Sequence, residues 1–221
     1  MSDIKPIKVW GNGGPNPPKV AILLEELGLP NEVVPISFPD LKKPEFLAIN
    51  PNGRMPAIQD PNTGLTLWES GAIVEYIIER YDTAQKLSFA PGSNDAYLAK
   101  QWLFFQVSGQ GPYYGQAVWF TKFHGEQVPS AIERYTKEIG RVTSVLEGHL
   151  AQEKEKNSGT DGPWLVGNKI SYADLAFVPW QRLVGMMLEG HKANEYPLVK
   201  EWLGKMTSRP AVKSVFEKAD H

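Results

Sequence analysis

A turn sequence in the first third of the chain combines residue types suited to holding an extended ligand. Residues 50–58 read Asn-Pro-Asn-Gly-Arg-Met-Pro-Ala-Ile and end in a short strand pattern. Because only bonds to proline adopt the cis form at modest cost, Met55-Pro56 is a candidate cis peptide at the first residue of that strand. Cis geometry there would turn the backbone N–H and C=O of Met55 outward, toward a ligand strand.

Glu69 and Ser70 stand where a second strand, residues 65–68, runs into a helix. The N–H groups at the start of a helix lack partners within it and bind carboxylates well. Ser70 is equally suited to an ordinary helix N-cap, with Glu69 as a solvated acid, and the two roles are compatible. Together the two segments describe a pocket for a short peptide with a free carboxylate.

The elements that must position these residues follow a recognisable order. Strand patterns occupy residues 7–10, 32–36, 55–58 and 65–68, and helical patterns cover 20–27, 44–49 and 73–81. A β-α-β unit followed by a β-hairpin and a helix is the thioredoxin-like arrangement. Residues 84–93 are polar and marked by Gly and Pro, which predicts a linker. The chain beyond it reads as helical, with patterns over 97–123, 130–156, 196–206 and 210–218 and a helix opening at 171–174.

Composition excludes several classes of function. The net charge of −2 argues against binding to nucleic acid or to an anionic membrane. The chain has no cysteine, so a disulfide, a thiolate metal site and a thiol nucleophile of its own are excluded. The four histidines lack metal-ligand spacing, and we expect no metal. No secretory signal or membrane-spanning apolar run is visible, and we expect a cytoplasmic protein.

The pairing of Asn50-Pro-x-Gly-x-x-Pro56 with Trp68-Glu-Ser-x-Ala-Ile73 resembles the soluble glutathione transferases, in particular their nu-class and fungal nitrogen-regulator-like branch. The resemblance implies an α/β plus all-α fold. A thioredoxin-like glutathione-binding domain would span residues 1–83, with a linker at 84–93 and an all-helical domain over 94–221 carrying the acceptor-substrate site. It also implies glutathione as cosubstrate, a hydrophobic small-molecule acceptor and a homodimer.

The activity implied by this resemblance is attack of the glutathione thiol on hydrophobic electrophiles, peroxides or disulfides. Conjugation, peroxide reduction and disulfide reduction remain open, and the alternative is a non-catalytic ligand-binding or regulatory protein. Asn16, just before the first helix, would stabilise the thiolate, with Asn12 as a second candidate. On pattern alone Asn16 is an ordinary turn or N-cap residue.

The remaining site residues are also carried over from the resemblance. Ser70 would bind the γ-glutamyl carboxylate and Glu69 the ammonium group, while Met55, beside Pro56, would pair with the cysteinyl backbone. One of two neighbouring lysines would hold the glycyl carboxylate, and Lys42 is preferred over Lys43. Arg54 would form a salt bridge either with the ligand or within the protein. Three aromatic side chains are candidates for the acceptor pocket, although such residues are core by default: Tyr113, Tyr114 and Phe120. Asp174, in Ser171-x-x-Asp174, is assigned a structural helix-capping role.

Overall fold

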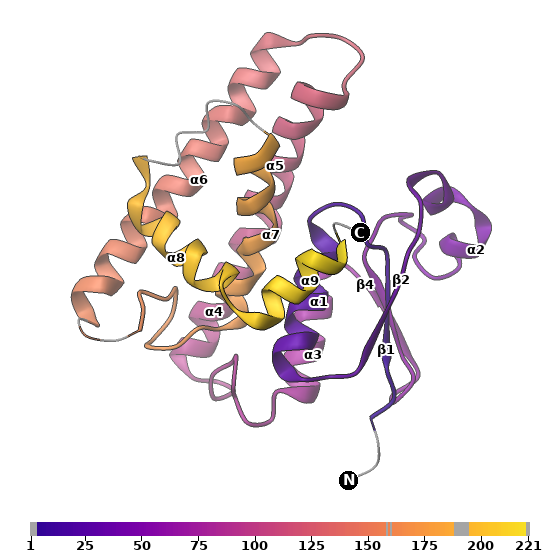
Figure 1. Cartoon of the computed structure of the whole chain (residues 1–221), viewed down its shortest axis with the longest axis horizontal. Helices are drawn as coiled ribbons and strands as arrows, with labels where there is room; N and C mark the ends of the chain where they lie inside the picture. Colours follow the sequence, from indigo (N-terminus) through magenta and orange to yellow (C-terminus); the bar gives the residue numbers. More distant parts are fainter. Residues whose placement is uncertain (1–3, 158, 160, 188–194, 220–221) are drawn as a thin grey trace. The chain divides into compact units, whose positions relative to one another are not determined.

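The computed structural model describes residues 4–157, 159, 161–187 and 195–219. The chain divides into two compact units (Figure 1). The first, here called the sheet unit, contains Met1–Leu87 together with Ser208–His221, and the second, the helical unit, contains Ser88–Thr207. The predicted boundaries differ from this division mainly at the C-terminal end, which the sequence assigned to the helical domain.

The sheet unit is built on four strands in the order β2-β1-β3-β4. β1 (Ile7–Trp10) pairs in parallel with β2 (Asn31–Val34), while β3 (Ala57–Asp60) is antiparallel to both β1 and β4 (Leu65–Trp68). α1 (Asn16–Leu27) connects the two parallel strands, and α3 (Ser70–Tyr81) follows the hairpin. A short 3-10 turn (Phe38–Lys42) and α2 (Pro44–Leu47) lie between β2 and β3. The predicted thioredoxin-like arrangement is confirmed.

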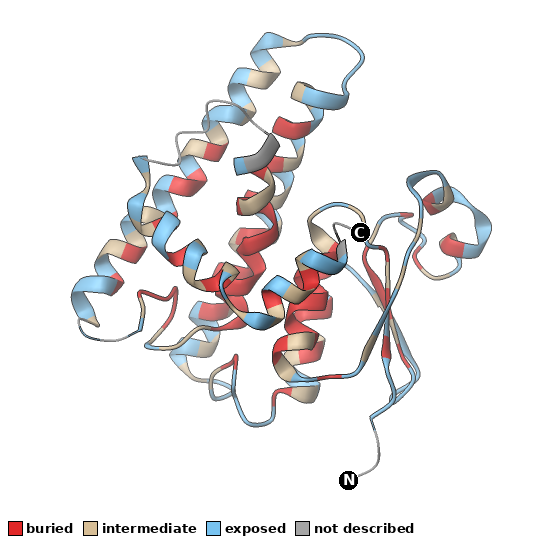
Figure 2. Ribbon diagram, viewed as in Figure 1, coloured by how far each residue is buried: buried red, intermediate tan, exposed pale blue. Residues whose placement is uncertain are grey.

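Burial follows the hydrophobic pattern of each element (Figure 2). Within the predicted helical pattern of α1, Val20, Leu23 and Leu24 are buried, and the inward residues of β1 and β3 are fully buried with them. α1 ends at Gly28, which takes the left-handed conformation (φ 68°) that favours glycine at this position. The core of the unit therefore lies between the sheet and the buried faces of α1 and α3.

The hairpin between β3 and β4 is fastened by one buried carboxylate. Asp60 accepts hydrogen bonds from the hydroxyls of Tyr76 (2.6 Å) and Tyr81 (2.5 Å) on α3, and from the backbone N–H of Asn62 (2.8 Å). Burial acts to raise the pKa of Asp60, but these hydrogen bonds outweigh it and hold the pKa below its usual range. The turn is thereby tied to the helix that follows it.

Within its described residues, the helical unit contains one long interrupted helix and three further helices. α4 (Asn94–Phe105) continues through a π-helical stretch (Gln106–Gln110) into α5 (Gly111–Val118), and a second π-helical stretch (Trp119–Phe123) ends it. α6 (Pro129–Lys156), α7 (Tyr172–Met187) and α8 (Pro197–Thr207) complete the unit. None of the helices in the described residues is long and apolar enough to cross a membrane.

Asp174 has the structural role that the sequence assigned to it. Its carboxylate is fully buried and accepts hydrogen bonds from both the backbone N–H and the hydroxyl of Ser171 (2.9 Å each), at the start of α7. It also accepts from the backbone N–H of Leu165 (2.8 Å) and from the indole of Trp202 on α8 (2.9 Å). The carboxylate thus joins a helix start, a loop and a neighbouring helix.

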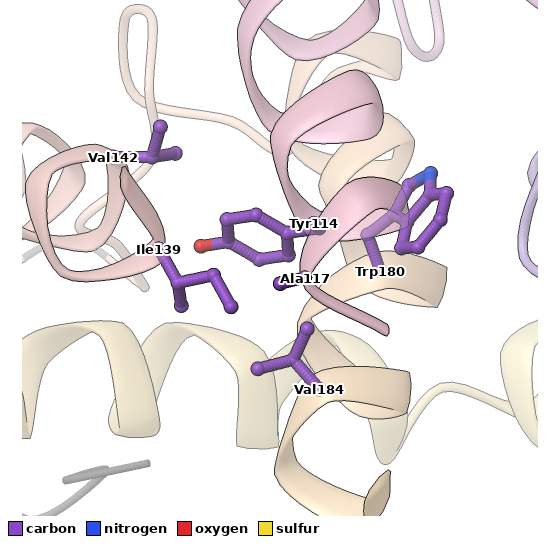
Figure 3. Close-up of a cluster of buried hydrophobic side chains, with 6 residues drawn as sticks. All are labelled: Tyr114, Ala117, Ile139, Val142, Trp180 and Val184. Carbon is purple, nitrogen blue, oxygen red and sulfur yellow. The ribbon is translucent and has the colours of Figure 1, made fainter. Parts of the chain in front are cut away.

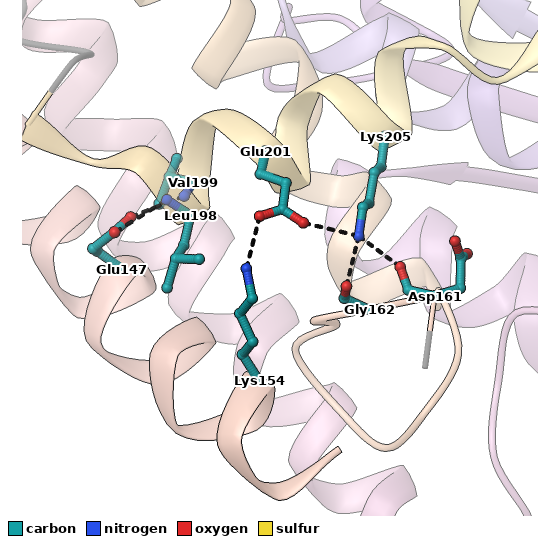
Figure 4. A network of polar contacts seen from close by, with 8 residues as sticks. All are labelled: Glu147, Lys154, Asp161, Gly162, Leu198, Val199, Glu201 and Lys205. Carbon is teal, nitrogen blue, oxygen red and sulfur yellow. Dashed lines mark hydrogen bonds and ion pairs between the residues drawn. The ribbon is translucent and has the colours of Figure 1, made fainter. Parts of the chain in front are cut away.

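A second polar network joins α6 to α8 (Figure 4). Glu147 on α6 accepts from the backbone N–H groups of Leu198 (3.1 Å) and Val199 (2.9 Å), which have no partner within the first turn of α8. About two turns further along α6, Lys154 pairs with Glu201 of α8 at 3.1 Å. A carboxylate at the N-terminus of α8 also complements the partial positive charge of that helix end.

Candidate functional site

The register of the sheet brings the predicted ligand-binding segments to one end of it. Ala57 at the start of β3 pairs with Trp10 at the end of β1 and with Trp68 at the end of β4. Adjacent strands lie about 4.8 Å apart, so the residues just beyond these positions are neighbours. The turn after β1, the Met55-Pro56 bond before β3 and the Glu69-Ser70 pair after β4 therefore meet at the same edge.

The turn after β1 lies directly against Met55. Gly11 has φ +99°, and a Cβ atom built on it would lie 2.5 Å from the Cβ of Met55, so this position requires glycine. The turn then leads to Asn16, which is half-buried and is the first residue of α1; the N-cap position is taken by Pro15. Asn16 thus stands at a helix N-terminus, at the end of the turn whose Gly11 lies against Met55, whereas Asn12 is exposed.

The Met55-Pro56 peptide bond is cis, as the sequence predicted. The turn that delivers it is held by Asn50, whose side-chain amide donates to the carbonyl of Arg54 (2.6 Å) and whose side-chain oxygen accepts from the backbone N–H of Asn52 (2.9 Å). Pro56 is buried and Met55 half-buried. The side chain of Arg54 is exposed, and its carbonyl is committed to the turn.

The two candidate lysines differ in their contacts. Lys42 donates to the carbonyl of Asn52 (3.0 Å), which places its ammonium group on the turn that precedes Met55. Lys43 instead pairs with Asp40 at 2.5 Å, and that contact raises the pKa of Lys43. Both side chains are exposed, but Lys42 is the one whose ammonium group is held at the turn predicted to bind the ligand.

Glu69 and Ser70 begin α3 in an unusual conformation. Glu69 is exposed and occupies the N-cap position with φ +73°, a value that non-glycine residues adopt only rarely. Ser70 is the first helical residue and is buried; its side chain therefore does not act as the N-cap that the sequence allowed for. Its hydroxyl oxygen instead accepts a hydrogen bond from the ammonium group of Lys19 at 3.0 Å.

Lys19 is the residue at this site that the sequence analysis missed. It is only 2% exposed, and it lies just before the helical pattern that the sequence analysis placed at residues 20–27. A signal for its burial was present, because Lys19 lies four residues before Leu23, on the apolar face of α1. Burial lowers the pKa of Lys19 to about 7, while the nearby charge of Glu69 acts in the opposite direction.

Two helix N-termini contribute to the electrostatics of this edge. α1 begins just beyond the end of β1, and α3 begins just beyond the end of β4. The first N–H groups of a helix lack intrahelical partners and carry partial positive charge, although Pro17 and Pro18 leave α1 with fewer of these N–H groups than α3. With Lys19 and Lys42 nearby, the arrangement suits a ligand that carries anionic groups.

The aromatic candidates of the helical unit separate into two environments. Tyr114 is fully buried in a core cluster with Ala117, Ile139, Val142, Trp180 and Val184 (Figure 3). Its hydroxyl bonds to Thr143 (3.0 Å) and accepts from Gln181 (3.3 Å), and burial raises its pKa to about 12. The assignment of Tyr114 to a substrate pocket is therefore corrected, because this side chain fills the core between helices.

Tyr113 and Phe120 differ from Tyr114 because they are half-buried. Both lie against Tyr135 of α6: the ring centroids of Tyr113 and Tyr135 are 6.4 Å apart, and Phe120 stacks on Tyr135 at 5.8 Å. Spaced seven residues apart, the two side chains share one helix face. They remain candidates for contact with an apolar acceptor.

A separate cavity of about 380 Å³ lies beside α1 in the sheet unit. Its lining comes from the strands β1 and β2, the turn at Asn12, α1 and the C-terminal helix α9 (Pro210–Ala219). It does not include Met55, Glu69 or Ser70. Among the residues that the structure describes, no cluster of His, Cys, Asp and Glu has the arrangement of a metal site.

Comparison with known proteins identifies the family of this chain. Residues 5–79 match the family described as glutathione S-transferase, N-terminal domain, and residues 112–210 match glutathione S-transferase, C-terminal domain. The glutathione S-transferase-like protein gedE of Aspergillus terreus is 61% identical over 218 residues, covering 97% of this chain and 96% of the relative. The chain belongs to the glutathione S-transferase family.

Solved structures similar to this chain include members of the fungal nitrogen-regulator-like branch, which the sequence motifs indicated. Glutathione transferase URE2P6 from Phanerochaete chrysosporium, solved with oxidised glutathione, is 45% identical with a TM-score of 0.89, covering 100% of this chain and 99% of that one. The nitrogen regulation fragment of the yeast prion protein Ure2p is 38% identical with a TM-score of 0.89, covering 98% of each chain. The resemblance to the fungal nitrogen-regulator-like branch is confirmed.

Proposed function

We propose that this chain binds glutathione at the edge where the β1 turn, Met55-Pro56 and Glu69-Ser70 meet, and ionises its thiol for attack on a second substrate. The observation that carries the proposal is that the turn leading to Asn16, the Met55-Pro56 segment and the N-termini of α1 and α3 lie at one edge of the sheet. The γ-glutamyl carboxylate lies at Ser70 and its ammonium group at Glu69. The cysteinyl backbone pairs with Met55, and the glycyl carboxylate reaches Lys42.

Asn16 is the proposed activating residue. A free thiol has a pKa of about 8.5, so most of it is protonated at neutral pH. The side-chain amide of Asn16 can donate a hydrogen bond to a thiolate, and the N-terminus of α1 adds positive potential. Lowering the thiol pKa by about two units requires ~2.7 kcal/mol of preferential stabilisation, which one donor to a charged acceptor and a helix end supply.

The ionised sulfur can react in three ways. With an organic hydroperoxide it attacks an oxygen and breaks the O–O bond, which releases an alkoxide that takes up a proton; a second glutathione then converts the resulting sulfenic acid to glutathione disulfide and water. With a hydrophobic electrophile it forms a carbon–sulfur bond and expels the leaving group. With a disulfide it forms a mixed disulfide and releases a thiolate, and a second glutathione then completes the reduction. Because this chain has no cysteine, the protein has no thiol of its own, and glutathione must provide the attacking sulfur in each of these reactions. Tyr113 and Phe120 are the proposed contacts for the apolar part of the acceptor.

Turnover assays test this proposal and sort the reactions. Purified protein is incubated with glutathione and, separately, a haloarene, an organic hydroperoxide and a low-molecular-weight disulfide. Saturable turnover of at least one acceptor, reduced at least tenfold in Asn16→Ala and unchanged in Asn12→Ala, supports the proposal. Binding of glutathione without turnover of any of the three contradicts a catalytic role.

A non-catalytic role is the second candidate, and the likeness to the nitrogen regulation fragment of Ure2p favours it. In that case the same site would bind glutathione to stabilise a conformation that a protein partner recognises. Retained glutathione affinity without turnover, together with partner binding that changes on adding glutathione, would support this alternative.

We also propose that the chain acts as a cytoplasmic homodimer. Large apolar side chains are exposed along α4 of the helical unit, at Tyr97, Leu98 and Phe104. An apolar stripe of this kind on a helix suits contact with another protein surface. Sedimentation equilibrium tests the proposal: a dimer mass that becomes a monomer mass in Phe104→Glu is expected, and a monomer mass for the wild type contradicts it.

A further inference from the structure

Lys19 and Ser70 form a buried polar contact beneath the ligand-binding edge of the sheet unit. The lysine nitrogen lies 3.0 Å from the serine hydroxyl oxygen, and the two residues are 2% and 8% exposed. Lysine is among the residues least often buried, so its position here needs a reason. Lys19 also lies one helical turn beyond Asn16 on α1, which links the start of α1 to the start of α3.

The protonation state of Lys19 decides which way the Ser70 hydroxyl points. A protonated ammonium group can only donate, so Ser70 must then accept with its oxygen and its hydrogen is available to another acceptor. A neutral amine has a lone pair and can accept that hydrogen instead. A carboxylate bound at the start of α3 needs the hydroxyl as a donor, and it therefore favours the protonated lysine.

The environment of Lys19 sets the pH range in which its protonation state, and with it the direction of the Ser70 hydroxyl, changes. Burial lowers its pKa to about 7, and Glu69 is the charged group that opposes this effect. The pKa of Lys19 is not shifted by the other ionisable groups on the elements packed against α1: Lys8 on β1, Glu32 on β2, Glu75, Tyr76, Glu79, Arg80 and Tyr81 on α3, and Lys213, Glu217 and Lys218 on α9. An arriving carboxylate is a new negative charge close to Lys19, which favours its protonated form.

We propose that Lys19 is a positioning residue for glutathione binding: it orients the Ser70 hydroxyl toward the γ-glutamyl carboxylate, and carboxylate binding is coupled to uptake of a proton by Lys19. This inference rests on the proposed function. It adds to that function a buried charge that acts through Ser70 and a proton linkage that depends on the carboxylate of the ligand.

Isothermal titration calorimetry with S-methylglutathione tests the proposal, because this ligand has no thiol proton to release. Binding enthalpies at pH 8 in phosphate and in Tris, whose ionisation enthalpies differ, give the number of protons taken up. We expect uptake of well over half a proton by the wild type. An S-methyl analogue with 4-aminobutyrate in place of the γ-glutamyl residue lacks the carboxylate, and we expect it to bind with little uptake.

Two variants with the same change of charge complete the experiment. Lys19→Met removes the buried ammonium group, and Lys218→Met removes an exposed one on α9. We expect Lys19→Met to lose the proton uptake and to weaken S-methylglutathione binding about ten- to hundredfold, while binding of the analogue stays unchanged. Lys218→Met should retain the wild-type uptake and affinity.

The outcomes separate this inference from the proposed function. If the wild type does not bind S-methylglutathione, the proposed function fails. If it binds, and Lys19→Met shows the same uptake and affinity, the inference is overturned while the proposed function stands. If Lys19→Met does not fold, the wild type is compared with S-methylglutathione and with the analogue that lacks the carboxylate. Greater proton uptake with S-methylglutathione supports the inference, and equal proton uptake with the two ligands overturns it.

Discussion

Arg209 donates two hydrogen bonds to Glu26, at 2.6 and 2.8 Å, across 183 residues of sequence. Glu26 lies on α1 and is only 5% exposed, while Arg209 immediately precedes α9. The same stretch of α1 receives a second ion pair, from Lys218 to Glu25 at 2.8 Å. The C-terminal segment is thereby fastened to the first helix of the sheet unit.

Replacing Arg209 with Ala should strongly destabilise the sheet unit. The change leaves the carboxylate of Glu26 buried without its guanidinium partner, which costs about 3 kcal/mol of unfolding free energy. Lys218→Ala is the matched control: its ion pair is largely exposed and is worth about 0.5 kcal/mol. Urea unfolding followed by tryptophan fluorescence measures both, and equal losses for the two variants would contradict this account.

Much of the fold could be predicted because its determinants are local. Apolar periodicity located β1, α1, β4 and α6 to within a few residues, and the Met55-Pro56 sequence indicated the cis bond. The position of α9 could not be predicted in this way. Its helix is visible in the sequence, but its attachment depends on partners such as Glu26 that lie far away in the chain.

The site residues illustrate the same limit. Glu69 and Ser70 were found because they follow a strand and precede a helix, a pattern visible over a few residues. Lys19 was missed because charge usually marks a solvated helix face, and here the lysine reaches a serine that is 51 residues away. Tyr114 was misassigned because periodicity does not distinguish a ring in a packed core from one that lines a pocket.

The two lysines before α2 should contribute unequally to ligand affinity. Lys42→Ala removes the ammonium group held at the turn before Met55, and we expect about tenfold weaker binding of glutathione. Lys43→Ala breaks an exposed pair with Asp40 and should change the affinity about twofold or less. Calorimetric titrations measure both constants.

A modified ligand provides the control for this pair. Glutathione with its glycyl carboxylate esterified has no charge for Lys42 to hold, so it should bind wild type and Lys42→Ala with equal affinity. A larger loss in Lys43→Ala than in Lys42→Ala would show that the glycyl carboxylate is held by the other lysine.

Tyr114→Phe should affect stability and leave turnover unchanged. The hydroxyl is buried and bonded to Thr143 and Gln181, so its removal costs about 1–2 kcal/mol of unfolding free energy. The neighbouring Tyr113 is half-buried, and Tyr113→Ala should raise the KM for an apolar acceptor several-fold. Thermal unfolding measures the effect on stability, and steady-state kinetics measure the effect on turnover. A drop in kcat for Tyr114→Phe would show that the Tyr114 hydroxyl takes part in the reaction.

The buried lysine should make stability depend on pH in a defined direction. The pKa of Lys19 is lowered from 10.5 to about 7 in the folded chain. Between these values the unfolded chain binds the extra proton, so the free energy of unfolding rises with pH across this window. The stability that Lys19 contributes is therefore fully present above the unfolded pKa and is lost as the pH falls through the folded pKa.

Comparison with Lys19→Met isolates this effect from the other titrating groups. Unfolding free energies of the two proteins, measured in urea from about pH 6 to pH 10, should diverge in favour of the wild type as the pH rises. Parallel curves over the whole range would indicate that Lys19 keeps an ordinary pKa in the folded chain.

Activation of the glutathione thiol by Asn16 is the central claim, and the ultraviolet absorbance of bound thiolate against pH tests it most directly. In the wild type and in Asn12→Ala, the bound thiol should titrate about two units below its free pKa of ~8.5. In Asn16→Ala the titration should shift back toward the free value. A bound thiol that titrates as in water, or that titrates identically in wild type and Asn16→Ala, would contradict the claim.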